Sequence, residues 1–465
     1  MICYTKLVNP FKENTTVYYW ANTGLPYKEN MRALFSGNEI IHRGNGKFSY
    51  SKLPYTNDVC YDGKDITYPK NIDTMIFEYY VQNDTYHPTP WQMAIYPNSH
   101  IFYEMSTAKA YCKKLFHWGE FTGGKNWQNL VGSDPNNTKY IEFQTGIAPS
   151  QFHDMLFEAN STIEWAQFYG AIKAYDLNQD YPEAQSKANE LLKSKSNYLE
   201  NIKSKLELLS QIPIKEKNII HYGNGFGYIE QKRIELDKDG YVPTSMLFPE
   251  SSVQPHEAPW LRLLATGQLN PHEDLTKMTY MTSHKWLSHL ETAIYNNPNW
   301  FTYYQYGIMA LGLEDFSKVS SETYNKELQY NLKSYAYEMF KKSINLKPTH
   351  YVYACLAILS MQLYKPNEPK IWWNKLFDIY PIKEDYALLK HYFINLNNTK
   401  RYEEIWTLFC SLKEDNSAHY DEISIRAAHA ALYLKKYKFL EQFFKAKHFS
   451  ICEGFTGITD LWYAY

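Results

Sequence analysis

Apolar and polar residues alternate over short runs in the first 170 residues of the chain. Pro, Gly, Asn and Asp separate these runs, which include Thr16–Trp20, Asn38–His42, Thr74–Tyr80 and Trp91–Tyr96. The run Tyr140–Gln144 alternates as a half-buried strand does, which places Glu142 and Gln144 on one face. Many short strands with turn signals and no helical period predict an antiparallel β-sandwich or barrel.

The periodicity becomes helical further along the chain. From Pro182 to about Ser210, leucines and isoleucines recur at helical spacing between lysines and glutamates (Leu192, Leu199, Ile202, Leu206 and Leu209). From Trp286 on, the chain predicts repeated helices. Ala336 and Phe340 precede Pro348 at the spacing of a tetratricopeptide second helix, and Pro381 follows Pro348 by 33 residues.

These patterns predict a multidomain chain that is β first and α afterwards. We expect a β-sandwich over residues 1–170, a helical linker over 171–250 and an α-helical solenoid of tetratricopeptide type over 251–465. The linker is expected to include a motif, Gly223–Glu230, that packs back on the sandwich.

Composition and charge narrow the function classes. A formal charge of −2 over 465 residues leaves no basic footprint for nucleic acid. Neither a membrane span nor a signal peptide is predicted, so a cytoplasmic protein is expected. Six cysteines without CxxC spacing, and no HExxH motif, predict no metal and no other cofactor. Aromatic residues make up 17% of the chain and suit both sugar stacking and helix-repeat cores.

Motifs scattered along nearly the whole chain carry a resemblance to a known family. They are Lys6–Pro10, Tyr18–Thr23, Lys114–Gly119, Tyr140–Gly146, Thr162–Gly170, Gly223–Glu230, Ala258–Leu264 and Glu453–Trp462. The chain resembles a bacterial family with a galactose-mutarotase-like β-super-sandwich, catalogued as domain of unknown function 5107 and usually followed by tetratricopeptide repeats. That family has further strands before the segment that matches this N-terminus. The resemblance therefore implies a partial super-sandwich, either truncated or completed by a separate chain encoded upstream.

The resemblance also implies roles for individual residues. Mutarotases open a sugar ring with a carboxylate base and a histidine acid. The strand around Glu142 and Gln144 resembles the one that holds the base in aldose epimerases; the alternative is a strand-face glutamate paired with Arg or Lys. Asn22 matches the asparagine of the epimerase acid strand, and Tyr18 stands where its histidine would be. Because the ordinary pKa of tyrosine is about 10, classical mutarotation is not expected.

A second candidate cluster lies at His117–Glu120, close to Trp127. His117 and Glu120 are candidate catalytic groups, and Trp118 and Trp127 are candidate stacking surfaces for a sugar. The alternative is that Trp118 belongs to the core and His117 binds a backbone carbonyl.

Two carboxylates, Glu120 and Glu142, would suit glycoside hydrolysis, in which the distance between them sets the stereochemical outcome. Arg32 and Glu230 complete the candidate substrate-binding residues.

Three functions follow from these residues. The first is a protein that binds or processes carbohydrate, with a saccharide as ligand. The second is a scaffold whose helical repeats bind a protein partner beside a degenerate sandwich. The third is a glycoside hydrolase that uses two carboxylates.

Overall fold

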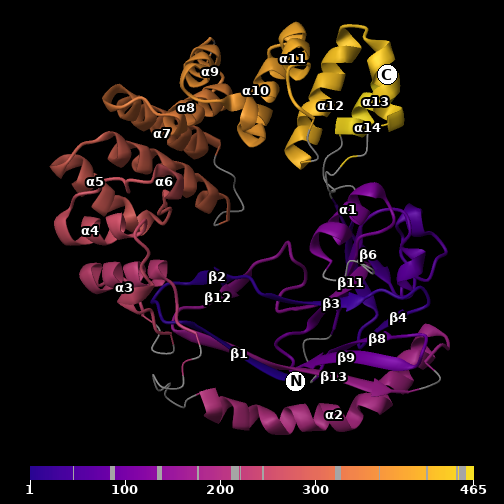
Figure 1. The fold of residues 1–465 in the computed structure, drawn as a ribbon. Coiled ribbons are helices and arrows are strands. Elements are labelled where there is room, and N and C mark those ends of the chain that lie inside the picture. The colour runs from indigo at the N-terminus through magenta and orange to yellow at the C-terminus, as the bar shows by residue number, and fades with distance from the viewer. Residues whose placement is uncertain are drawn as a thin grey trace. The chain divides into compact units, whose positions relative to one another are not determined.

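The computed structural model describes residues 1–44, 47–83, 89–132, 139–174, 177–210, 219, 221–242, 246–319, 326–365, 367–414, 417–446, 449 and 457–465. Within these residues the chain divides into two compact units, a sandwich unit inside Met1–Pro213 and a helical unit from Ile214 on. The predicted fold class, β-sheets followed by helices, is confirmed (Figure 1).

Two antiparallel sheets form the sandwich unit. The five-stranded sheet has the spatial order β1 (Ile2–Asn9), β13 (Ser161–Lys173), β9 (His100–Ser106), β8 (Trp91–Ile95) and β4 (Arg32–Phe35). The six-stranded sheet has the order β3 (Trp20–Pro26), β11 (Tyr140–Gly146), β10 (Cys112–His117), β7 (Phe77–Gln82), β5 (Glu39–Gly44) and β6 (Lys47–Lys52). A small two-stranded sheet pairs β2 (Thr15–Val17) with β12 (Met155–Phe157).

The long helix α2 (Tyr181–Ser210) covers the side of the five-stranded sheet that faces away from the six-stranded sheet (Figure 1). Ala184, Ala188 and Leu192 of this helix are buried in the same core as Trp91 and Met93. The indole nitrogen of Trp91 donates to Asn189 at 2.8 Å. The helix predicted from Pro182 on is therefore confirmed, and Leu192 and Leu199 are buried; the side chains of Ile202, Leu206 and Leu209 lie outside the described residues.

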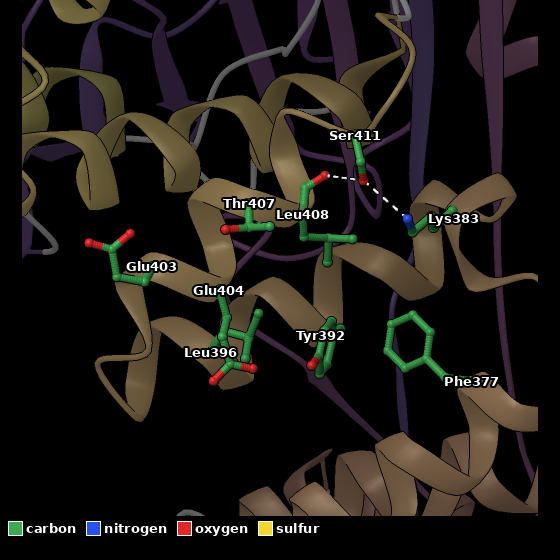
Figure 2. A pocket seen from close by; sticks show the side chains of 9 residues that line it. All are labelled: Phe377, Lys383, Tyr392, Leu396, Glu403, Glu404, Thr407, Leu408 and Ser411. Atoms are coloured by element: carbon green, nitrogen blue, oxygen red, sulfur yellow. Dashed lines mark hydrogen bonds between the residues drawn. The ribbon is translucent and has the colours of Figure 1, made fainter.

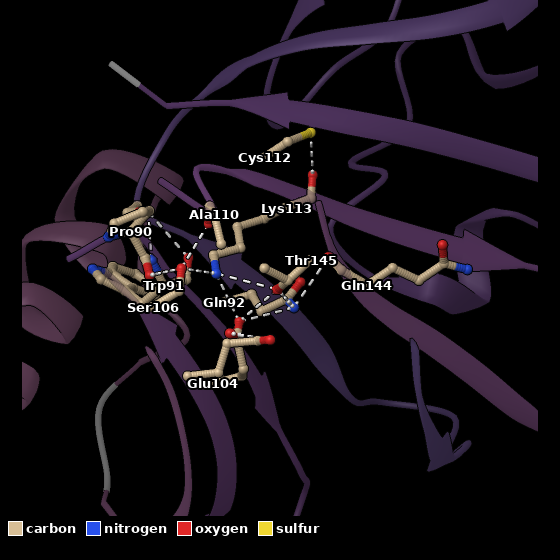
Figure 3. A network of polar contacts seen from close by, with 12 residues as sticks. Pro90, Trp91, Gln92, Glu104, Ser106, Ala110, Cys112, Lys113, Gln144 and Thr145 are labelled. Atoms are coloured by element: carbon tan, nitrogen blue, oxygen red, sulfur yellow. Dashed lines mark hydrogen bonds and ion pairs between the residues drawn. The ribbon is translucent and has the colours of Figure 1, made fainter. Parts of the chain in front are cut away.

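A fully buried ion pair lies between the two sheets (Figure 3). The Lys113 ammonium donates to Glu104 at 2.8 Å, to Ser106 at 2.7 Å and to Thr145 at 3.2 Å. Glu104 also accepts from Gln92 at 3.2 Å and from Gln167 at 3.1 Å. Burial lowers the pKa of Lys113, and Glu104 opposes that shift. Because every charged atom of the pair has partners, the network joins the two sheets without leaving a buried charge alone.

The helical unit contains pairs of antiparallel helices. Its helices are α3 (Gly225–Asp237), α4 (Ala258–Thr266), α5 (Leu287–Asn296), α6 (Trp300–Val319), α7 (Lys326–Leu346), α8 (His350–Gln362), α9 (Glu368–Ile379), α10 (Tyr386–Asn398), α11 (Tyr402–Phe409), α12 (Ala418–Tyr433), α13 (Tyr437–Ala446) and α14 (Gly457–Ala464). Chain neighbours pack together, as α6 does with α7 and α8 with α9. A Cβ on Gly307 would lie 2.5 Å from the Phe340 ring, so this glycine allows α6 and α7 to approach closely.

The structure corrects two local expectations in the first third of the chain. The run Thr16–Trp20 is not one strand, because Tyr18 and Tyr19 separate β2 from β3. A helix, α1 (Thr122–Val131), interrupts the predicted all-β region. Gly124 lies too close to the Trp118 carbonyl for any side chain, which is why a glycine stands in this helix.

Among the described helices, none is both long and apolar enough to cross a membrane. Residues 450–456 lie outside the described residues. They include the first residues, from Glu453, of the C-terminal motif that resembles the family.

Candidate functional site

The outer face of the six-stranded sheet, meaning the face turned away from the five-stranded sheet, brings several candidate residues together. Directly opposed residues on antiparallel strands share a face. Asn22 on β3 is opposite Gln144 on β11, which is opposite Lys114 on β10, which is opposite Tyr80 on β7. Glu142 lies on the same face, opposite Phe116 of β10. The predicted pairing of Glu142 and Gln144 on one face therefore agrees with the observed register.

A directed chain of hydrogen bonds runs along this face to Glu142. The Lys114 ammonium donates to Oε1 of Gln151 at 2.5 Å, and Nε2 of Gln151 donates to Oε1 of Gln144 at 2.7 Å. Nε2 of Gln144 then donates to Oε2 of Glu142 at 2.7 Å. Each amide is oriented by the one before it, so the ammonium at one end fixes how the carboxylate is held at the other.

Lys114 also forms an ion pair at the head of this chain. Its ammonium lies 2.6 Å from the carboxylate of Glu78, 5.0 Å from the ring centre of Tyr80 and 5.1 Å from that of Phe116. Burial lowers the pKa of Lys114, while Glu78 and then Glu142 oppose the shift. The lysine is nearly inaccessible, with a side chain 2% exposed, whereas Glu78 is 20% exposed. Lys114 is therefore a buried support, and the carboxylates are the groups that reach solvent.

Aromatic residues border the carboxylates on the same face. The hydroxyl of Tyr140 donates to Oε1 of Glu142 at 3.3 Å. Trp20 lies over Gly146, where a Cβ would come within 2.6 Å of the indole, and it contacts Tyr80 edge-on at 5.7 Å. Asn22 and Tyr18 are exposed. Burial raises the pKa of Tyr18, and the carboxylates of Glu78 and Asp154 raise it further. This residue is therefore an even poorer proton donor than an ordinary tyrosine.

His117 lies on the opposite face from Glu142. Its strand partner on β11 is Ile141, so the ring points into the sandwich beside Tyr27, at 5.6 Å between ring centres. Nδ1 of His117 accepts the backbone N–H of Gly119 at 2.9 Å. Burial lowers the pKa of His117 to about 4. The ring is therefore neutral near pH 7, and the strand alternation keeps it from acting together with Glu142.

The buried neutral state of His117 predicts a pH-dependent stability. The unfolded chain takes up a proton on this histidine near pH 6.5, and the folded chain does so only near pH 4. The contribution of His117 to the free energy of unfolding is therefore fully present above about pH 6.5. It is lost as the pH falls towards 4, by up to about 3 kcal/mol. Urea unfolding at about pH 7 and about pH 4.5 measures the loss.

His117→Gln is expected to remove this part of the pH dependence, because glutamine does not titrate. The exposed His100 supplies the matched control, and His100→Gln should leave the dependence unchanged. An unaltered slope in His117→Gln would contradict the assignment.

The other members of the second cluster are held by local contacts. Glu120 accepts from Lys139 at 2.7 and 2.9 Å and lies 3.6 Å from Lys125. Partial burial would raise the pKa of Glu120, but these lysines lower it overall. Trp118 is 9% exposed and stacks on Trp127 at 5.6 Å. Glu120 is thus an ionised partner of lysines, and Trp118 belongs to the buried part of the sandwich unit.

Arg32 and Glu230 do not lie on the outer face. Arg32 on β4 is 2% exposed and donates to the backbone carbonyls of Leu177 and Gln179 just before α2. Glu230 belongs to α3 in the helical unit, where it accepts from the buried Arg233 at 2.7 Å and from the indole of Trp286 at 3.0 Å. The contacts described for both residues are those of structural side chains.

Sequence reasoning missed three residues of this face: Glu78, Lys114 and Gln151. Lys114 follows Lys113 directly, and successive side chains of a strand point to opposite faces. The sequence therefore already indicated that one of these two lysines lies on the outer face. The partners of Lys114 come from β7 and from the segment after β11, and only the strand register brings them together.

A second candidate surface is a groove between helices in the helical unit (Figure 2). Its volume is about 510 Å³, and its walls come from α9, α10, α11 and the short turn before α10. Apolar residues form its floor, Glu403 and Glu404 lie at one end, and the Lys383 ammonium donates to Ser411 at 3.1 Å at the other (Figure 2). Glu404 is paired with Arg401.

Comparison with solved structures bears on the fold. A TPR-domain containing protein from Parabacteroides distasonis ATCC 8503 matches with a TM-score of 0.58 at 13% identity, over 100% of this chain and 67% of that chain. This likeness supports a tetratricopeptide-like helical part. The Slr1438 protein from Synechocystis sp. PCC 6803 matches with a TM-score of 0.25 at 10% identity, over 37% of this chain and 50% of that chain. No protein-family model and no curated protein matches the chain.

Proposed function

We propose that the protein binds carbohydrate on the outer face of the six-stranded sheet. The observation that carries the proposal is the hydrogen-bond chain from Lys114 to Glu142, which orients a partly exposed carboxylate beside aromatic rings. Sugar hydroxyls bind carboxylate and amide groups, and the apolar faces of sugar rings stack on aromatic side chains. Glu142, Asn22 and Tyr140 supply such groups on the neighbouring strands β3 and β11.

The resemblance to a mutarotase-like sandwich adds support for this ligand class. The same resemblance indicates Glu142 as the group that would accept a proton from a sugar hydroxyl. We propose binding without catalysis, because Tyr18 occupies the place of the acid and its pKa is raised by burial and by neighbouring carboxylates. A hydrolase that pairs Glu142 with Glu120 is less favoured, because Glu120 is committed to two lysines.

Glu142→Gln is expected to weaken saccharide binding about 10- to 100-fold, because a charged acceptor of sugar hydroxyls becomes a neutral amide. A glycan array with the full chain identifies the ligand, and titration calorimetry with that ligand measures the change. Glu183→Gln is the matched control, since Glu183 is an exposed carboxylate on α2 of the same unit. Equal affinity in wild type and Glu142→Gln would remove Glu142 from the site.

A second candidate function is that of a scaffold that binds a protein partner in the groove of Figure 2. The observation that favours it is the groove itself, with a floor that includes Tyr392 and Leu408 and with opposite charges at its two ends.

Leu408→Asp in the full chain is expected to abolish the capture of a groove-bound partner, because a charge would stand on the apolar floor. Affinity purification followed by cross-linking measures which residues touch the partner. Leu346→Asp, at an exposed leucine that ends α7, is the control. Unchanged cross-links in Leu408→Asp would contradict this function.

A further inference from the structure

The outer face extends well beyond Glu142 to an exposed group of aromatic residues. Phe48 and Tyr50 on β6 are 41% and 72% exposed, and Phe152, after β11, is 47% exposed. We call these three residues the aromatic platform. The ring of Phe152 lies 5.7 Å from that of Phe48, and the guanidinium of Arg43 lies 4.5 Å above Phe152.

The strand register places the platform on the same face as the candidate site. Tyr50 is opposite Ile41 of β5, and Ile41 is opposite Tyr80 of β7. Tyr80 is opposite Lys114, which is opposite Gln144. Since opposed residues share a face, these positions form one row across the sheet.

The distance along the sheet is large compared with one sugar ring. Phe48 on β6 and Glu142 on β11 are separated by four strand-to-strand steps, which amounts to about 19 Å at the usual spacing. Between them, Phe116 and Glu78 are half-buried and reach the surface. A ligand that contacts both ends must therefore be several sugar units long.

We propose that this face takes a neutral oligosaccharide that extends from Glu142 to the aromatic platform. The inference rests on the proposed carbohydrate binding and specifies its ligand. Glu142 receives its hydrogen bonds from the neutral groups of Gln144 and Tyr140, and Glu78 is already paired with Lys114. The partly exposed carboxylate of Glu142 disfavours an acidic sugar.

The edge of the sheet disfavours a protein strand as occupant of the platform. β6 is the edge strand, and it begins at Lys47 and ends at Lys52. Terminal lysines on an edge strand oppose pairing with another chain. The platform rings are interspersed with the polar groups of Arg43 and His153, which suits a hydroxyl-rich ligand better than an apolar protein surface.

The test is calorimetry of the full chain with neutral gluco-, xylo- and galacto-oligosaccharides of increasing length, from the monosaccharide upward. We expect affinity to rise at least about tenfold from the monosaccharide to the longest oligomer, as ring stacking adds contacts. In Phe48→Ala/Tyr50→Ala this gain is lost, while binding of the shortest ligand is unchanged. Tyr50→Ser alone, at a strongly exposed position, guards against a folding effect and should lose part of the gain.

Tyr295→Ala is the matched control, because Tyr295 is an 89% exposed tyrosine in the helical unit. Its length dependence should equal that of the wild type. If the monosaccharide binds as tightly as the oligomers, the extended ligand is overturned and the proposed function stands. If no saccharide binds while a protein or a second copy of the chain covers the platform, both are overturned.

Discussion

Replacing Lys113 by methionine is expected to lower the free energy of unfolding of the sandwich unit by about 3–5 kcal/mol. The side chains of Lys113 and Glu104 are 0% and 1% exposed, and the methionine would fill most of the space of the lysine stem. The variant keeps Glu104 buried with only neutral donors, from Gln92, Thr145 and Gln167. A buried carboxylate without its cation carries a desolvation penalty that neutral hydrogen bonds repay in part. Urea unfolding of Lys113→Met and of the wild type, side by side at about pH 7, measures the loss.

Two controls separate the buried pair from a general lysine effect. Lys64 pairs with Asp73 at 3.0 Å at the surface, with side chains 39% and 51% exposed, so Lys64→Met should cost about 0–1 kcal/mol. Lys113→Met combined with Glu104→Leu removes both charges and should recover much of the loss. A cost below about 1 kcal/mol for Lys113→Met alone would show that the pair is not held as tightly as its contacts indicate.

The Lys113–Lys114 pair illustrates what sequence could and could not predict. Lysine is almost never fully buried without a partner, so two consecutive lysines in a strand suggest at least one solvent-exposed side chain. Here both are buried on opposite faces, Lys113 beside Glu104 of the preceding strand in the other sheet and Lys114 beside Glu78 of β7. Local patterns do not contain that pairing, because it depends on the strand order β11-β10-β7 and on the register of the sheets.

Other parts of the fold were accessible because they depend on local periodicity. The alternation at Tyr140–Gln144 correctly placed Glu142 and Gln144 together, and the helical spacing after Pro182 correctly predicted α2. His117 shows that proximity in the sequence does not place two residues on the same face of a sheet. It follows Phe116 directly, and the register that sets Phe116 opposite Glu142 turns His117 to the other face.

Replacing Arg233 by methionine is expected to lower the free energy of unfolding of the helical unit by about 3 kcal/mol. The guanidinium is 0% exposed and serves three carboxylates: Glu230 at 2.7 Å, Asp237 at 3.0 Å and Asp239 at 2.8 Å. Burial alone would lower the pKa of Arg233, but the hydrogen bonds to Glu230 and Asp239 raise it overall. Removing this cation leaves three carboxylates close together along α3 and just after it.

Arg233→Lys tests whether the geometry or only the charge matters. A lysine ammonium is a compact point charge without the planar fork, so it is expected to recover less than half of the lost stability. Lys232→Met is the control, since the ammonium of this neighbouring lysine pairs with the exposed Glu235 at the surface. Hydrogen exchange of amides in α3 and α5 reports the change locally, because Trp286 and His289 connect this cluster to α5 and the turn before it. Full recovery by Arg233→Lys would mean that net charge, and not the three-way hydrogen bonding of Arg233, holds Glu230 in its structural role.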